Sequence, residues 1–174
     1  MDELILLRLP QAKGWIEIED NEDLLGISRI LQGAYGYKVD RDQCEVSGAS
    51  AEIEEIIFGW LWDDSVCENR DEKEVATKIM LPGSDVWFAV TSEDIMSARI
   101  ILNNAYGIDI TTENTKVKVD IPELQEYVDA NISKVKPGMW KNFLYSLSVA
   151  SADMLKYDEP LKDATKRIDA WLVK

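Results

Sequence analysis

The 174-residue chain contains no histidine. Serine–histidine–aspartate triads, cysteine–histidine pairs and metal centres with imidazole ligands all need this side chain. The sequence also has neither a GxxxxGK[ST] phosphate loop nor a GxGxxG dinucleotide pattern. These absences exclude the commonest catalytic sites, so we expect a protein without enzyme activity and without a cofactor.

Cysteine is also scarce. Cys44 and Cys67 stand 23 residues apart with no second pair, which excludes the usual zinc spacings. The acidic pairs Asp40/Asp42 and Asp63/Asp64 could in principle hold Mg²⁺ or Ca²⁺, but such pairs arise freely among 33 acidic residues. We therefore expect solvated turns there, and no metal site.

Long apolar segments are missing too. The longest uncharged run, residues 142–152, is far shorter than the roughly 20 residues that span a bilayer. Met1, Asp2 and Glu3 form an acidic start, which is unlike the basic start of a secretory signal. We expect a cytoplasmic protein with reduced cysteines and no membrane association.

Basic residues are outnumbered, with 19 Lys and Arg against 33 Asp and Glu, which gives a formal net charge of −14. Residues 1–133 carry a net charge of −17 and residues 134–174 a net charge of +3. An acidic field of this size repels nucleic acid and attracts basic proteins. We expect a basic protein partner and no direct nucleic-acid binding; the alternative is that the charge only keeps the protein soluble.

An internal similarity organises the sequence. Residues 22–36 align without gaps to residues 93–107, and seven of the 15 positions are identical, including a shared Ala-Tyr-Gly ending. Upstream, Leu9, Pro10 and Trp15 match Leu81, Pro82 and Trp87. The pattern predicts a duplication with a period of about 71 residues; chance similarity between two amphipathic helices is the alternative.

Each copy predicts the same succession of elements. A strand (residues 14–19 and 86–90) leads through a cap at Asn21 or Ser92 into a helix that Gly36 or Gly107 ends. A second strand (37–46 and 108–119) and a second helix (50–62 and 122–132) follow, with more strand possible between residues 75 and 81. Two β-α-β-α units indicate an α+β fold, for which a ferredoxin-like arrangement is one candidate.

The last 41 residues differ from the repeats. Apolar residues recur at helical spacing from 139 to 156, and Pro160 can open a final helix. We expect three domains: a first α+β unit (1–80), a second α+β unit (81–133), and a C-terminal helical hairpin (134–174) packed on them. Alternatively the hairpin makes a homodimer.

Two segments are candidates for partner binding. The first is a run of carboxylates at the start of the first repeat helix, and its members are Glu17, Glu19, Asp20, Glu22 and Asp23. Such a run could imitate nucleic-acid phosphates, or it could be ordinary surface.

The second segment is the helix over residues 50–62. Ile53, Ile56, Ile57, Trp60 and Leu61 share one helical face, which we expect to be buried. Phe58 and Trp62 fall roughly opposite, among Glu54, Glu55, Asp63 and Asp64. Aromatic residues beside acids suit an interface anchor; a helix buried on two sides is the alternative.

These observations favour a non-catalytic inhibitor of a basic nucleic-acid-binding protein, comparable in charge and size to anti-restriction, anti-CRISPR or toxin-immunity proteins. The alternative is a tandem regulatory module that binds a small ligand at the repeat interface. An enzyme that uses carboxylates is a third hypothesis, for which the sequence offers no distinctive set of residues.

Overall fold

The computed structural model describes residues 4–62 and 75–170 and has an α+β fold. The chain divides into two compact units. The first unit comprises residues 1–69 and 97–109, and the second comprises residues 70–96 and 110–174. The later half of the second repeat's first helix thus belongs to the first unit, and the three domains expected from the sequence stay a prediction.

The first unit contains a three-stranded antiparallel sheet in the order β2-β1-β3. Its strands are β1 (Ile5–Arg8), β2 (Ile16–Ile18) and β3 (Glu45–Ser47). Leu7, Ile16 and Ile18 are buried, whereas the alternate positions Glu17 and Glu45 are exposed. The sheet therefore has one apolar inner face and one polar outer face, as the two-residue period of a strand requires. We call the outer face sheet face A.

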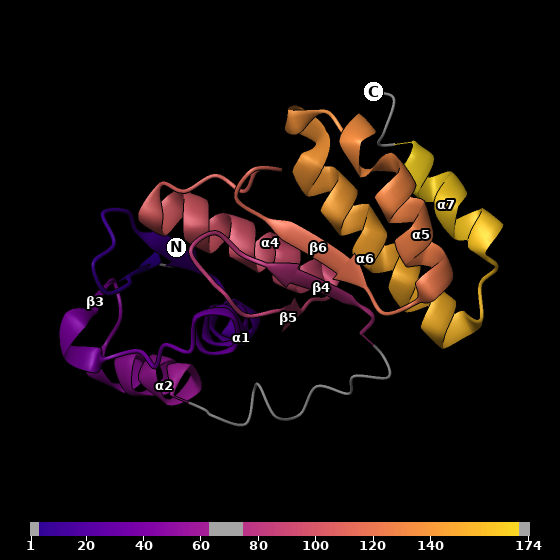
Figure 1. The fold of residues 1–174 in the computed structure, drawn as a ribbon. Coiled ribbons are helices and arrows are strands. Elements are labelled where there is room, and N and C mark those ends of the chain that lie inside the picture. The colour runs from indigo at the N-terminus through magenta and orange to yellow at the C-terminus, as the bar shows by residue number, and fades with distance from the viewer. Residues whose placement is uncertain (1–3, 63–74, 171–174) are drawn as a thin grey trace. The chain divides into compact units, whose positions relative to one another are not determined.

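The helices of the first unit are α1 (Asn21–Arg29), which continues as a π-helical turn η1 (Ile30–Ala34), and α2 (Ala51–Leu61). A short 3-10 turn, η2 (Arg41–Gln43), precedes β3. α1 and α2 pack together (Figure 1), and the backbone oxygen of Leu61 accepts hydrogen bonds from Ser28 Oγ at 3.4 Å and Gln32 Nε2 at 3.2 Å.

The two repeat helices begin one residue earlier than predicted. Asp20, not Asn21, caps α1, and its carboxylate accepts hydrogen bonds from the backbone N–H groups of Glu22 and Asp23. In the second repeat Thr91, not Ser92, makes the equivalent bond to the N–H of Asp94. In both cases the third helical carboxylate bonds back to the cap, so the capping box decides the start.

The two helices also end alike. The second helix, α4 (Ser92–Ile100), continues as the π-helical turn η3 (Ile101–Ala105), as α1 continues as η1. Gly36 and Gly107 follow with φ of 61° and 68°, so the predicted left-handed ends are confirmed. The π-helical turns were not predicted from the sequence.

The second unit contains a second antiparallel sheet in the order β5-β4-β6. Its strands are β4 (Thr77–Met80), β5 (Phe88–Ala89) and β6 (Lys116–Val119). Thr77 and Ile79 lie on the inner face, where α6 packs on β4. Lys78, Met80, Lys116 and Lys118 occupy the alternate positions, which form the outer face; we call it sheet face B.

Three further helices lie in the second unit, and the first two of them contact this sheet. They are α5 (Pro122–Asn131), α6 (Trp140–Tyr157) and α7 (Leu161–Asp169), with the 3-10 turns η4 (Ile132–Lys134) and η5 (Pro137–Met139) between α5 and α6. α6 and α7 pack as a hairpin beside α5 (Figure 1), as the tail sequence predicts. Ser151 Oγ and Thr77 Oγ1, 2.6 Å apart, join α6 to β4 through a buried hydrogen bond.

The two halves of the chain repeat one order of elements: two strands, a helix with a π-helical end, a strand and a helix. A ferredoxin-like arrangement is not confirmed, because each half forms its own three-stranded sheet. Each repeat contains one strand more than the β-α-β-α unit, and it is the central strand of its sheet. In the second repeat this strand is β4, within the residues 75–81 where the sequence allows more strand; in the first repeat it is β1, which was not predicted.

Candidate functional site

The carboxylates of the first candidate segment lie where β2 passes into α1. Glu17, Glu19, Asp20 and Glu22 are exposed, and Asp23 is partly buried. Among the residues that the structure describes, none of these five forms an ion pair with a Lys or Arg side chain. The structure thus brings them together into an acidic group that we call the junction carboxylates.

Asp20 and Asp23 have a structural task within this group. Asp20 caps α1, and Asp23 Oδ2 accepts hydrogen bonds from the backbone N–H groups of Glu19 at 2.7 Å and Asp20 at 3.3 Å. These bonds satisfy N–H groups at the start of the helix, where its dipole also favours negative charge. Glu17, Glu19 and Glu22 have no such bond from a described side chain or backbone, so they remain the members available to a partner.

The second candidate segment, α2, is oriented differently from the prediction. Its buried residues are Ile57, Phe58 and Leu61. Phe58 is only 5% exposed, and the guanidinium of Arg41 lies 4.9 Å from the centre of its ring. Phe58 therefore cannot anchor a partner in this structure. The prediction was wrong because the preceding loop supplies Arg41 as a cover that a helical projection does not contain.

The exposed side of α2 holds apolar residues that sequence reasoning assigned to the core. Ile53 is 38% exposed and Ile56 is 53% exposed, three residues apart on the helix. Trp62, just past the helix, is 45% exposed, and its indole N–H donates to the backbone oxygen of Val39. We call Ile53, Ile56 and Trp62 the α2 apolar residues. No signal in the sequence separated Ile53 and Ile56 from Ile57 and Leu61, whereas Trp62 is exposed, as the sequence predicts.

The acids predicted around α2 fall into three groups. Glu55 forms an ion pair with Arg41 at 2.7 Å, and this bond lowers the pKa of its carboxyl group below the usual value. Glu54 is partly exposed and forms no ion pair with a described residue. Asp63 and Asp64 lie outside the described residues. Of the acids predicted here that the structure describes, Glu54 is the one without an ion pair.

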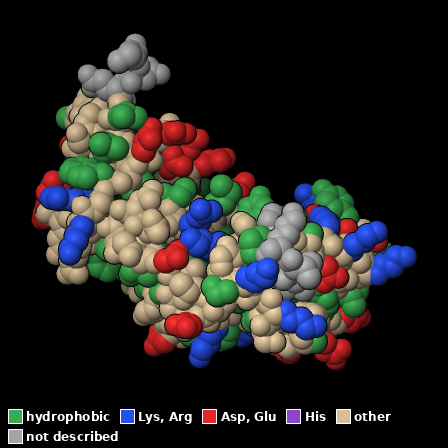
Figure 2. Space-filling model, turned by 90° about the horizontal axis from the view of Figure 1, so that it is seen from above, with side chains coloured by type: hydrophobic (Ala, Val, Ile, Leu, Met, Phe, Trp, Pro, Cys, Tyr) green, Lys and Arg blue, Asp and Glu red, His purple; other side chains and the backbone are tan. Residues whose placement is uncertain are grey.

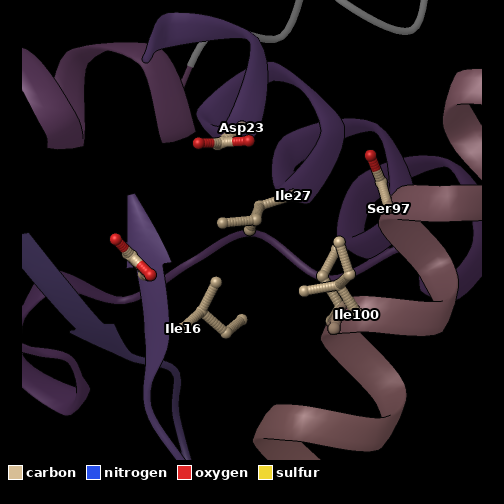
Figure 3. Close-up of a pocket in the computed structure, with 7 residues that line it drawn as sticks. Ile16, Asp23, Ile27, Ser97 and Ile100 are labelled. Atoms are coloured by element: carbon tan, nitrogen blue, oxygen red, sulfur yellow. The ribbon is translucent and has the colours of Figure 1, made fainter. Parts of the chain in front are cut away.

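A small pocket lies in the first unit between β2, α1 and the end of α4 (Figure 3). Ile16, Asp23, Ile27, Ser97 and Ile100 point toward it, and Glu17 and Ile101 complete its lining. Its volume of about 50 Å³ is well below the roughly 300 Å³ at which ligand pockets begin. The pocket can hold ordered water but not a metabolite, so it gives no support to a ligand site there.

The reactive side chains of the first unit are in their protonated forms near neutral pH. Burial, together with the nearby negative charge of Asp40, raises the pKa of the Cys44 thiol to about 11. Burial also raises the pKa values of Tyr35 and Tyr106 to about 12. A thiol with such a pKa is a poor nucleophile.

Within residues 4–62 and 75–170, no group of three or more Cys, Asp or Glu side chains could hold a metal ion. No helix in this part of the chain is long and apolar enough to cross a membrane.

The surface is not uniformly acidic. Figure 2 shows Lys and Arg side chains lying between Asp and Glu side chains over much of the visible face. The net charge of −14 is therefore distributed over separate patches, and the local groups decide what each patch can bind.

Comparison of the chain with protein-family models, with curated proteins and with solved structures gives no match. The function must therefore be inferred from the residues and their arrangement.

Proposed function

We propose that this chain is a non-catalytic binding protein that inhibits a basic nucleic-acid-binding protein by occupying its cationic surface. The observation that carries the proposal is the group of junction carboxylates, in which Glu17, Glu19 and Glu22 are exposed and unpaired among the described residues. Closely spaced negative charges without local cations attract a basic surface and accelerate its association.

The α2 apolar residues support this proposal, because charge alone gives weak binding. Stable interfaces combine a small apolar centre with a charged rim. Ile53, Ile56 and Trp62 supply exposed apolar area in the same unit as the junction carboxylates. Of the two anchors predicted from the sequence, Trp62 remains in this set, and Ile53 and Ile56 replace the buried Phe58.

We also propose that the two halves arose by duplication of one unit. The support is the equal order of elements, the equal strand order in the two sheets, and the π-helical turn at the same alignment position in both. The second repeat has Ala89 at the position of Glu17 and the neutral Thr91 at the position of the cap Asp20. The binding surface thus belongs to the first copy.

The test is an affinity capture from nuclease-treated cell lysate with three forms of the protein. These are the unaltered chain, the triple variant Glu17→Lys/Glu19→Lys/Glu22→Lys, and a control with the same charge change at exposed acids of the second unit, Glu113→Lys/Glu123→Lys/Glu126→Lys. We expect the unaltered chain and the control to retain one basic nucleic-acid-binding protein that salt releases, and the triple variant to lose it.

Equal capture by the triple variant, or no specific partner for the unaltered chain, would contradict the proposal. Far-ultraviolet circular dichroism of the three forms checks that each is folded. Because the triple variant and the control carry the same change in net charge, the experiment separates a local effect from one of net charge.

A further inference from the structure

The outer faces of the two sheets are equivalent in geometry. In sheet face A, β1 pairs Arg8 with Glu45 and Leu6 with Ser47. In sheet face B, β4 pairs Met80 with Lys116 and Lys78 with Lys118 in the same register. Each face also has a tryptophan at the matching alignment position, Trp15 or Trp87, and a cation lies over each ring.

The charges on the two faces are opposite in sign. Sheet face A exposes Glu17 and Glu45, and its one cation, Arg8, is paired with Glu45 and lies 5.2 Å from the ring centre of Trp15. Glu19 extends the acidic row beyond β2.

Sheet face B presents three lysines. Lys78 is held by Asp120 at 2.9 Å, Lys118 lies 4.6 Å from the ring centre of Trp87, and Lys116 is exposed. Lys116 and Lys118 form no ion pair with a described residue. In a chain with 33 acids and 19 bases, this sheet surface is locally basic.

The cross-strand pair of Lys78 and Lys118 needs an explanation. Like charges directly opposite each other in a sheet are destabilising, and Asp120 compensates only one of the two. A row of carboxylates from a binding partner would compensate the positive charges of Lys118 and Lys116. Sheet face A offers such a row on an antiparallel sheet of the same size.

We infer that sheet face B binds sheet face A of a second copy of this chain. Glu17 and Glu45 of one copy meet Lys116 and Lys118 of the other, and the exposed parts of Trp15 and Trp87 give the contact apolar area. The acidic net charge does not prevent it, because charges beyond the Debye length of about 8 Å are screened at physiological salt and the local groups decide.

The contact is small. Three strands of about four residues cover roughly 13 by 10 Å, much less than the ~800 Å² per partner of a standard interface. The association is therefore weak, and it depends on salt because ion pairs carry it. Since the two faces differ, the contact is heterologous and can extend beyond a dimer unless the copies close a ring.

The test is sedimentation velocity of the purified chain from about 10 μM to about 1 mM, a range that suits contacts of this strength. We expect the mean mass to rise with concentration at low salt and to fall back toward the monomer at high salt. Two reversal variants, Lys116→Glu/Lys118→Glu and Glu17→Lys/Glu45→Lys, should each stay monomeric. An equimolar mixture of the two should associate again, as a complex that contains both.

A matched control reverses two exposed lysines on α7, Lys162→Glu/Lys166→Glu, and should associate as the unaltered chain does. A monomer at every concentration, an association that survives both reversals, or a mixture that remains monomeric would overturn the inference. Melting curves of each variant confirm folding. The test uses purified protein without any other partner, so its outcome is independent of the proposed inhibitor function.

Discussion

The two repeats differ in a systematic way. Positions that point into the protein are alike: Leu24, Ile27 and Ile30 of the first repeat helix are buried, and so are their counterparts Ile95, Ala98 and Ile101. The outer sheet faces differ in charge, as Glu45 and the equivalent Lys116 illustrate. Buried positions are restrained by packing, whereas exposed positions are free to acquire different partners. The comparison teaches that the binding properties of the repeats lie in what differs.

The largest expected effect on the free energy of unfolding comes from a substitution in the first unit, where Gly14 of the first repeat lies against the backbone of the second. Both N–H groups of Lys13 and Gly14 donate to the backbone oxygen of Ala105 at 3.1 Å, at the end of the π-helical turn η3. A side chain at residue 14 would place its Cβ 1.8 Å from the backbone oxygen of Asn104.

We therefore expect Gly14→Ala to lower the free energy of unfolding by about 3 kcal/mol, at the upper end of overpacking effects. Urea unfolding followed by circular dichroism measures it. The control is Gly59→Ala in α2, where a Cβ meets nothing within 4 Å and helix propensity predicts a gain of up to ~1 kcal/mol. Equal stability of the two variants would contradict a close contact between the loop at residues 13–14 and the π-helical turn η3.

The crossing of the two repeat helices provides the second prediction. Gly26 and Ser97 occupy the same alignment position in the two repeats, and a Cβ at residue 26 would lie 2.3 Å from Ser97 Oγ and 2.9 Å from Ser97 Cβ. We expect Gly26→Ala to cost about 2 kcal/mol and the added change Ser97→Gly to restore most of it. A double-mutant cycle with Ser97→Gly alone measures the coupling, and additive effects would contradict the helix contact.

The paired tyrosines at the ends of the two repeat helices supply a pH prediction. Burial raises the pKa values of Tyr35 and Tyr106 from 10 to about 12 in the folded chain. The folded state then holds its phenolic protons more tightly than the unfolded state, so stability is full below pH 10 and falls as the pH rises from 10 to 12. Tyr35→Phe and Tyr106→Phe should each weaken this alkaline loss, which urea unfolding at a series of pH values measures. An absorbance titration in which all six tyrosines ionise together near pH 10 would exclude the effect.

Removal of the cations that lie over the two tryptophans has the smallest expected effect on the free energy of unfolding. Arg8 over Trp15 and Lys118 over Trp87 each contribute about 0.5–1 kcal/mol if such contacts behave as they do at exposed sites. Arg8→Met should cost more than Lys118→Met, because it also leaves Glu45 without its ion pair. Chemical unfolding measures both, and a larger loss from Lys118→Met would reverse the comparison between the two sheet faces.

Some elements could be predicted from the sequence, and the reasons are local. The apolar spacing of residues 24–34 and 95–105 determines the buried side of each repeat helix, and Gly36 and Gly107 determine where it ends. The strand β1 escaped prediction because it lies in a short apolar run, residues 4–7, without alternation, which periodicity cannot assign to a strand. Because β1 is the central strand of the first sheet, the strand order could not be predicted without it.

The sequence by itself therefore determined the repeat, the buried sides of its helices, the terminal hairpin and the excess of acidic charge, because each of these is set by neighbours along the chain or by composition. The tertiary structure decided which charges remain available. Arg41 covers the ring of Phe58 and forms an ion pair with Glu55, and Asp20 and Asp23 form the N-terminal cap of α1. The two sheets share one register, but the outer face of the first exposes carboxylates and that of the second exposes lysines. Such pairings join residues distant in sequence or depend on which side of a strand faces the core, and no local pattern specifies them.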